Sequence, residues 1–183
     1  MKIIFLDIDG VLNSSEYRNR MGRKYYSEII DRSKMPLLKE IVEATDAKIV
    51  LSTSWRKFWN QGEHQLDSIG QHINTVFAEF GLSVHSKTPV RENAGRSAEI
   101  AAWLDGKRYV EEYAILDDRD FGWSAEQRVH FVRTDQNGDG LDDVQAQEVI
   151  DVLNGKLIPV MERFGNEKNR LKVWLKRCFE RIK

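Results

Sequence analysis

The sequence predicts an α/β protein in which a central parallel sheet carries helices on both faces. Short, continuous apolar runs recur along the chain, which is typical of strands buried on both sides. Amphipathic helical patterns separate these runs, and such alternation favours parallel strands joined by right-handed crossovers. The chain has 183 residues, of which 41% are hydrophobic, so we expect one domain with its own core.

Each element is expected from its own pattern. Five segments are expected as strands: 2–6, 48–51, 112–116, the weaker candidate 129–132 and a short additional one at 82–84. Four segments are expected as helices: 35–44, 63–80, 97–104 and one from about 142 to 154. Pro36 suits a first-turn position in the first of these helices. No repeat, linker or low-complexity segment interrupts the series.

The composition excludes several classes of protein. The 28 basic and 29 acidic residues nearly balance, and the hydrophobic content is too high for a disordered tail protein. Cys178 is the single cysteine, which excludes a disulfide scaffold and suits a reducing compartment. The apolar run before Asp7 is too short for a signal-peptide core or a membrane span. We therefore expect a cytoplasmic protein.

The charge is unevenly distributed. Residues 163–183 carry a net charge of +6, which leaves −7 on the rest of the chain. A boundary is expected at Asn154-Gly155, between a domain of residues 1–154 and a basic helical tail of residues 155–183. One face of the tail is apolar, formed by Leu171, Trp174, Leu175, Cys178 and Ile182. Packing of this amphipathic helix on the domain is the default expectation, and contact with nucleic acid or another partner is the alternative.

Two acids follow the first expected strand directly. The strand runs into Asp7-Ile8-Asp9-Gly10-Val11, at the edge of the sheet where α/β proteins bind ligands. Gly10 permits a sharp turn of the backbone. Two neighbouring carboxylates repel each other unless a cation or a shared proton relieves them. Mg²⁺ suits such a site, because it prefers hard oxygen ligands and keeps positions open for water and phosphate.

The order of the motifs resembles the haloacid dehalogenase (HAD) superfamily of phosphohydrolases. Its first motif, D-x-D-x-[TV], is matched by residues 7–11; its second, an apolar strand ending in Ser or Thr, by residues 49–52; and its fourth, a strand ending in paired acids, by residues 114–118. The resemblance covers roughly residues 2–153. Residues 52–56, Gly95-Arg96 before residues 99–104, and residues 116–118 resemble the small-capped branch associated with RNA repair. The implied fold is a Rossmann-like, HAD-type three-layer sandwich with a minimal cap.

The resemblance implies a role for each motif residue. Asp7 is expected to attack phosphorus, and Asp9 to act as general acid and base. Asp117 and Asp118 are expected to bind Mg²⁺ together with Asp7 and the backbone carbonyl of Asp9. Ser52 and Arg96 are expected to bind the phosphoryl oxygens. A dehalogenase normally lacks the second acid, which argues against that reaction.

Two of these assignments have competitors in the sequence. Thr53 replaces Ser52 as the phosphate contact if the strand ends one residue later, because a slip of one residue reverses the face. The third motif needs one basic residue, for which Arg96 is favoured over three others: Lys87, Arg91 and Lys107. An arginine there offers a planar fork in place of the point charge of a lysine.

Three other stretches of the sequence each have a functional and a simpler interpretation. Residues 13–34 are expected to form a small flap, and its basic stretch 18–26 suits either solvated loop charges or contact with a second phosphate or a nucleic-acid backbone. Residues 55–59 combine aromatic with basic side chains, as base-stacking surfaces do, although core or pocket-wall roles are the simpler expectation. Residues 135–140 open like an EF-hand, but Ala146 stands where a bidentate Glu is required.

The sequence thus favours a Mg²⁺-dependent phosphomonoester hydrolase that forms an aspartyl-phosphate. The insert of residues 13–34 is short for a full cap domain, so the site is expected to be open. This open site, the basic flap and the basic tail favour a nucleotide or a phosphorylated nucleic-acid end as substrate. The alternative is a binding module that keeps the fold and holds nucleic acid or a protein partner. A phosphotransferase would share the same aspartyl chemistry.

Overall fold

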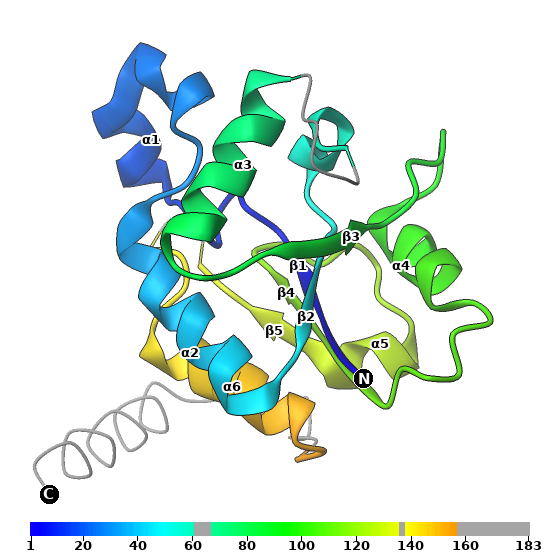
Figure 1. The fold of residues 1–183 in the computed structure, drawn as a ribbon. Coiled ribbons are helices and arrows are strands. Elements are labelled where there is room, and N and C mark those ends of the chain that lie inside the picture. Colours follow the sequence, from blue (N-terminus) through cyan, green and yellow to red (C-terminus); the bar gives the residue numbers. More distant parts are fainter. Residues whose placement is uncertain (61–66, 136–137, 157–183) are drawn as a thin grey trace, which may run out of the picture.

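The fold is a five-stranded parallel sheet between two layers of helices, in the order β3-β2-β1-β4-β5. The computed structural model describes residues 1–60, 67–135 and 138–156 (Figure 1). The strands are β1 (Lys2–Leu6), β2 (Lys48–Leu51), β3 (Val84–Lys87), β4 (Glu112–Asp117) and β5 (Phe131–Arg133). The α-helices are α1 (Ser15–Met21), α2 (Met35–Thr45), α3 (Ser68–Glu79), α4 (Arg96–Leu104), α5 (Ala125–His130) and α6 (Asp143–Leu153). The α/β prediction is confirmed.

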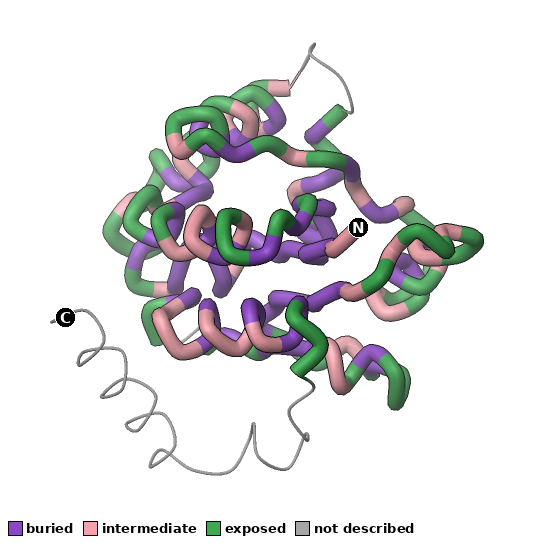
Figure 2. The backbone as a smooth tube through the Cα atoms, turned by 60° about the horizontal axis from the view of Figure 1, so that its bottom comes forward, coloured by how far each residue is buried: buried purple, intermediate pink, exposed green. Residues whose placement is uncertain are grey.

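Side-chain alternation along β1 divides the core into two apolar clusters. Ile4 and Leu6 point to the cluster that includes side chains of α2, α3 and α6, while Ile3 and Phe5 point to the cluster that includes α4. All four side chains are fully buried, as expected for a strand in the middle of the sheet. Figure 2 shows buried residues along the strands and exposed residues on the outer turns of the helices.

Two strands differ from their sequence prediction. The strand expected at 82–84 begins at Val84 and runs to Lys87, because α3 ends in a turn at Gly81 with φ of 72° and the ladder with β2 starts at Val84. The strand expected at 129–132 begins at Phe131, because residues 125–130 form α5. Ser124 and Gln127 form a capping box at the start of α5, which outweighs the β-branched Val129.

The four expected helices are present with small shifts at their ends. The segments at 35–44, 97–104 and 142–154 correspond to α2, α4 and α6. Of the segment 63–80, the described part forms α3 from Ser68, with Asp67 as its N-cap. The expected basic tail lies outside the described residues from residue 157 onward. None of the helices in the described part of the chain combines the length and the hydropathy that a membrane span requires.

The expected flap at 13–34 is an ordered insert between β1 and α2. It consists of α1, η1 (Gly22–Ser27) and η2 (Arg32–Lys34), two of which are 3₁₀ helices. Buried Tyr17 ties its two ends together, since its hydroxyl donates to the backbone carbonyls of Glu28 and Ile30, at 3.0 Å each. The insert therefore has a fixed shape beside the end of β1.

Candidate active site

Adjacent strands β1 and β4 bring two acids together at one edge of the sheet. Leu6 pairs with Leu116, and the ladder continues one step as the Asp7 amide donates to the Leu116 carbonyl at 3.0 Å. The Asp7 side chain lies on the same face of the sheet as Phe5, two residues before it, and the Asp117 side chain lies on the same face as Ile115. Both acids therefore lie on the sheet face that α4 covers.

A cluster of three buried carboxylates results. Asp7, Asp117 and Asp118 each offer an oxygen, and these oxygens lie within 4.8 Å of one another. Asp117 is fully buried, and Asp7 and Asp118 are 4% and 5% exposed. Three carboxylate oxygens are the donor set that a hard divalent cation prefers. The cluster fits a metal site, and we call it the acid cluster.

Burial and mutual repulsion dominate the electrostatics of the acid cluster. Burial raises the pKa of Asp117 well above its ordinary value, and the charge of Asp7 raises it further, against the lowering effect of Arg96. The pKa of Asp118 is raised for the same two reasons, burial first and Asp7 second. A cation bound between these carboxylates would relieve both costs.

The backbone turn at Gly10 lets Asp118 approach the first motif. Gly10 has φ of 75°, and a Cβ added there would lie 2.7 Å from the Asp118 side chain. The Gly10 amide donates to the Asn13 side chain at 3.0 Å, and its carbonyl accepts from the Thr134 hydroxyl at 2.7 Å. Only glycine satisfies both the positive φ and the close approach.

Arg96 is the basic residue that reaches the acids. Its Nη1 donates to Asp7 Oδ2 at 2.5 Å and also to Asp117 Oδ2. Burial lowers the pKa of Arg96, but Asp7 and Asp117 more than compensate and leave it above its ordinary value. The ring of Phe121 stacks on the guanidinium, with its centroid 4.4 Å from Cζ. Arg96 therefore holds a fixed positive charge beside Asp7.

The three competing basic residues lie away from the acid cluster or point to solvent. The Lys87 amine donates to the carbonyls of Arg56 and Trp59, and the Lys107 amine donates to the Trp103 carbonyl. The side chain of Arg91 is exposed. None of the three has a recorded contact with the acid cluster.

The hydroxyls of Ser52 and Thr53 have opposite surroundings. The Ser52 amide donates to the Leu6 carbonyl at 2.9 Å, so Ser52 extends the alternation of β2 and lies on the same face as Val50, toward α4. Its Oγ is buried and has no hydrogen-bond partner among the described residues. The Thr53 hydroxyl accepts from the Trp55 amide at 3.4 Å and caps η3 (Ser54–Phe58). A buried hydroxyl without a partner is costly, which suits a group that binds a ligand oxygen.

Asp9 is held by residues that the sequence did not connect with it. Its Oδ1 accepts hydrogen bonds from the Tyr25 hydroxyl and, at 3.2 Å, from Asn13 Nδ2. Its Oδ2 accepts from Trp55 Nε1 at 2.9 Å. The Asp9 carboxylate thus faces the insert and η3, and it is not one of the three carboxylates of the acid cluster. Tyr25 and Trp55 lie in the sequence stretches 18–26 and 55–59 that suit contact with nucleic acid, but no sequence pattern connects either of them with Asp9.

Arg56 connects η3, which follows Ser52, to α4, which begins at Arg96. Its guanidinium forms an ion pair with Glu99 of α4 at 2.5 Å, and the two side chains are 5% and 8% exposed. Arg56 Nη1 also donates to the Thr53 carbonyl at 2.7 Å. Burial lowers the pKa of Arg56, and the charge of Glu99 opposes that effect. The pair therefore fixes the end of β2 against the first turn of α4.

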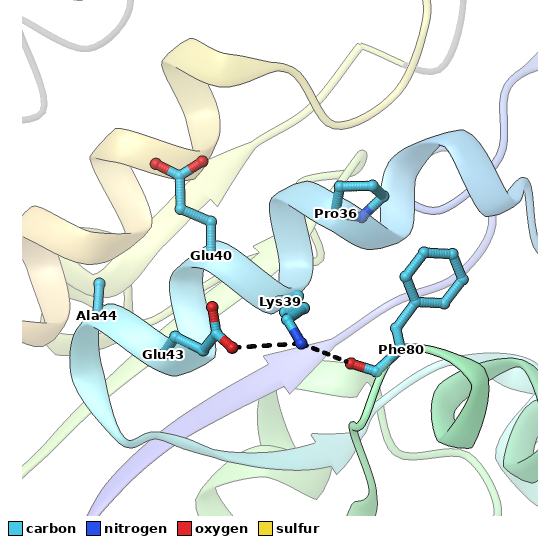
Figure 3. Close-up of a pocket in the computed structure, with 6 residues that line it drawn as sticks. All are labelled: Pro36, Lys39, Glu40, Glu43, Ala44 and Phe80. Atoms are coloured by element: carbon cyan, nitrogen blue, oxygen red, sulfur yellow. Dashed lines mark hydrogen bonds and ion pairs between the residues drawn. The ribbon is translucent and has the colours of Figure 1, made fainter. Parts of the chain in front are cut away.

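Two other regions are separate from this site. In the loop that opens like an EF-hand, Asp135 and Gly140 form an isolated antiparallel bridge, and Asp139 pairs with Lys34 at 2.7 Å. A shallow hollow on α2 contains none of the predicted site residues, and Lys39 spans it by contacting Glu43 and the Phe80 carbonyl (Figure 3). The hollow is lined by Pro36, Lys39, Glu40, Glu43, Ala44 and Phe80.

Comparison with known proteins identifies the family. A family described as the HAD domain in Swiss Army Knife RNA repair proteins matches residues 3–146. No curated protein and no solved structure shows a match. The matched range includes the acid cluster, Ser52, Arg96 and the insert. Since the match spans well over half of the sequence, this chain belongs to the HAD domains of Swiss Army Knife RNA repair proteins.

Proposed function

We propose that the protein is a Mg²⁺-dependent phosphomonoester hydrolase that acts on phosphorylated nucleic-acid ends. The family supports a phosphohydrolase in the context of RNA repair. One observation carries the proposal: oxygens of Asp7, Asp117 and Asp118 lie within 4.8 Å of one another at the strand ends. Beside them, Arg96 forms an ion pair with Asp7, and the Ser52 hydroxyl, without a partner among the described residues, lies at the end of the neighbouring strand on the same face. Acids, a cation and a free donor are what phosphoryl transfer requires.

The proposed reaction has two steps. An oxygen of Asp7 attacks phosphorus, the bond from phosphorus to the leaving oxygen breaks, and Asp9 gives that oxygen its proton. Asp9, now ionised, takes a proton from water as the water oxygen attacks the aspartyl-phosphate. The bond between phosphorus and Asp7 then breaks and releases inorganic phosphate. Both acids return to their starting states.

The remaining site residues stabilise charge. Ser52 and Arg96 donate to phosphoryl oxygens, on which negative charge grows in the transition state. Asp7, Asp117 and Asp118 would hold Mg²⁺, which supplies electrostatic neutralisation and orientation of the phosphoryl group. Tyr25, Asn13 and Trp55 are positioning residues, because they fix the Asp9 carboxylate.

The experiment is a phosphatase assay with and without Mg²⁺ on an aryl phosphate and on oligonucleotides phosphorylated at the 3′ or 5′ end. We expect metal-dependent release of phosphate by the wild type and none by Asp7→Asn. Asp9→Asn should lose about 10²- to 10⁴-fold, the usual contribution of a general acid. Full activity of Asp7→Asn would refute the nucleophile, and metal-independent nucleic-acid binding without turnover would favour a binding module instead.

A further inference from the structure

Four aromatic side chains form a continuous strip that leads from Asp9 to the surface. The ring of Tyr25 lies 6.0 Å from that of Tyr26 and 6.3 Å from that of Trp55, in edge-to-face arrangements at 67° and 68°. Trp55 in turn lies 6.2 Å from Phe58. The inner pair, Tyr25 and Trp55, donates hydrogen bonds to Asp9. We call these four residues the aromatic strip.

The outer ends of the aromatic strip are exposed. Tyr26 is 70% exposed and Phe58 is 41% exposed, and they are two of the four large hydrophobic side chains that are exposed in the described part of the chain. Isolated exposed aromatics are common on protein surfaces, but these two flank buried Tyr25 and half-buried Trp55, which both contact a proposed catalytic acid. Their exposure therefore lies next to the site.

The surface around the aromatic strip is basic. Arg23, Lys24 and Lys57 are exposed and lie within three residues of Tyr26 or Phe58 in the sequence. Their side chains form no ion pair with any residue in the described ranges. Arg18 stacks on Tyr25 at 5.3 Å and pairs with Asp9 at 3.8 Å, so it is not one of the unpaired cations, and the nearby Glu28 is already paired with Arg32 at 2.8 Å. Exposed rings among unpaired cations suit a polyanion with aromatic groups, and they do not suit an acidic peptide lacking rings.

The proposed chemistry places the leaving group on the same side. Asp9 gives its proton to the leaving oxygen, so the leaving group must lie on the Asp9 side of phosphorus. Asp9 faces Tyr25 and Trp55, whereas Arg96 bonds Asp7 and Asp117. A nucleoside leaving group would therefore extend along the aromatic strip.

We propose that the aromatic strip stacks the terminal bases of a single-stranded nucleic acid whose end phosphate is hydrolysed at Asp7, while Arg23, Lys24 and Lys57 contact its backbone. This inference rests on the proposed function and narrows its substrate. Stacking requires unpaired bases and tolerates any sequence, because every base has a π-face. Duplex ends should accordingly be poorer substrates than single-stranded ends.

The test pairs substrates with and without bases. One oligonucleotide carries a terminal phosphate, at the 5′ end in one arm and at the 3′ end in the other, and its partner has abasic sites at the two terminal positions. The wild type should favour the base-containing partner in kcat/KM by about 10-fold or more, since stacking is worth roughly 1–3 kcal/mol per base. The double variant Tyr26→Ala/Phe58→Ala should lose this preference and leave turnover of the abasic substrate unchanged.

Matched variants separate stacking from structure. Tyr26→Phe/Phe58→Tyr keeps both rings and should retain the preference. Tyr109→Ala removes another exposed aromatic side chain, which is 57% exposed. Tyr109 lies before the start of β4, at the end of the strands opposite to the acid cluster, so this variant should keep the wild-type preference for the base-containing substrate. An undiminished preference in the double-alanine variant, or an equal loss on both substrates, would overturn the proposal.

Binding distinguishes this inference from the proposed function. The same two oligonucleotides are titrated into Asp7→Asn and followed by fluorescence anisotropy. If the wild type hydrolyses no phosphate ester, the proposed function fails. Base stacking by the aromatic strip would still be supported if the base-containing oligonucleotide binds more tightly than the abasic one and this difference is lost in Tyr26→Ala/Phe58→Ala. Equal binding of both oligonucleotides would overturn it.

Discussion

At the scale of single residues, Ser52 and Thr53 show how one position along a strand separates a buried hydroxyl without a partner among the described residues from one that caps a helix. Ser52 Oγ is buried without a partner, whereas the Thr53 hydroxyl caps η3. Ser52→Ala should lower kcat by about 10²-fold, as removal of one transition-state donor does, with little change in stability. Thr53→Ala should instead cost about 1 kcal/mol of unfolding free energy, the usual value of a lost N-cap. Parallel kinetics and urea unfolding check both.

The reverse pattern, in which Thr53→Ala loses turnover and Ser52→Ala unfolds more easily, would show that Thr53 is the phosphate contact. The sequence placed both hydroxyls correctly at the end of a strand. It could not choose between them because the choice depends on the hydrogen bond from Ser52 to Leu6 across the sheet.

The predictability of the other site residues follows the same logic. Asp7, Asp117 and Asp118 were predicted because each directly follows or ends an apolar run, and parallel strands bring such ends together. Tyr25 and Trp55 were missed as partners of Asp9, because they reach it through the fold of an insert and a 3₁₀ helix, which no local pattern specifies.

At the scale of elements, the ion pair between Arg56 and Glu99 joins η3 to α4. Removing one partner of a buried pair leaves the other charge unpaired, at a cost of about 3–5 kcal/mol. Arg56→Ala should therefore unfold at much lower urea concentration, while Lys57→Ala, exposed on the same element, should change the unfolding free energy by less than about 0.5 kcal/mol. Equal stability of the two variants would contradict a joining role for Arg56.

We expect half-buried His72 to make the packing of α3 against the insert sensitive to pH. Burial is the largest effect on His72 and lowers its pKa below the ordinary value of 6.5. The charge of Arg32 also lowers this pKa, whereas the charges of Glu28 and Glu79 raise it without cancelling the effect of burial. The unfolded chain therefore takes up a proton at a higher pH than the folded chain. The contribution of neutral His72 to the free energy of unfolding should be fully present above about pH 6.5 and should decrease as the pH drops below that value.

Thermal unfolding between pH 7 and 5 checks this expectation. His72→Gln should show a shallower loss of melting temperature across that range than the wild type, and His85→Gln, an exposed histidine, should follow the wild type. An identical pH slope for His72→Gln and the wild type would assign the acid sensitivity to other groups.

The elements themselves were mostly predictable. Strands β1, β2 and β4, which are buried beyond their first residues, stand out as continuous apolar runs, and α2 and α6 as amphipathic patterns. The starts of β3 and β5 were less predictable. The turn at Gly81 makes β3 begin later than expected, and the capping box of Ser124 and Gln127 makes α5 occupy the first residues of the segment expected as β5. Local capping there outweighs the apolar pattern on which the strand prediction relied.

At the scale of the whole molecule, the fold gathers like charges at one edge of the sheet at the expense of stability. Burial raises the pKa of Asp118, and Asp7 adds to it, so the ionised cluster opposes folding when no cation is bound. Without metal, Asp118→Asn should melt at a higher temperature than the wild type. Mg²⁺ should stabilise the wild type by about 2.7 kcal/mol at a concentration 100 times its dissociation constant, and Asp118→Asn by less.

Differential scanning fluorimetry with and without Mg²⁺ makes this comparison, with the exposed Asp105→Asn as the control. A wild type that Mg²⁺ leaves unchanged, or an Asp118→Asn variant stabilised as strongly as the wild type, would argue that no cation binds between these carboxylates.

The most direct test is to locate the phosphoryl group during turnover. The wild type, mixed with excess phosphorylated substrate and Mg²⁺ and quenched in acid, is digested and its peptides are analysed by mass spectrometry. Phosphate is expected on Asp7 of the wild type and on no peptide of Asp7→Asn. Phosphate on another residue of the wild type, or an unmodified Asp7 throughout rapid turnover, would contradict covalent catalysis at the end of β1.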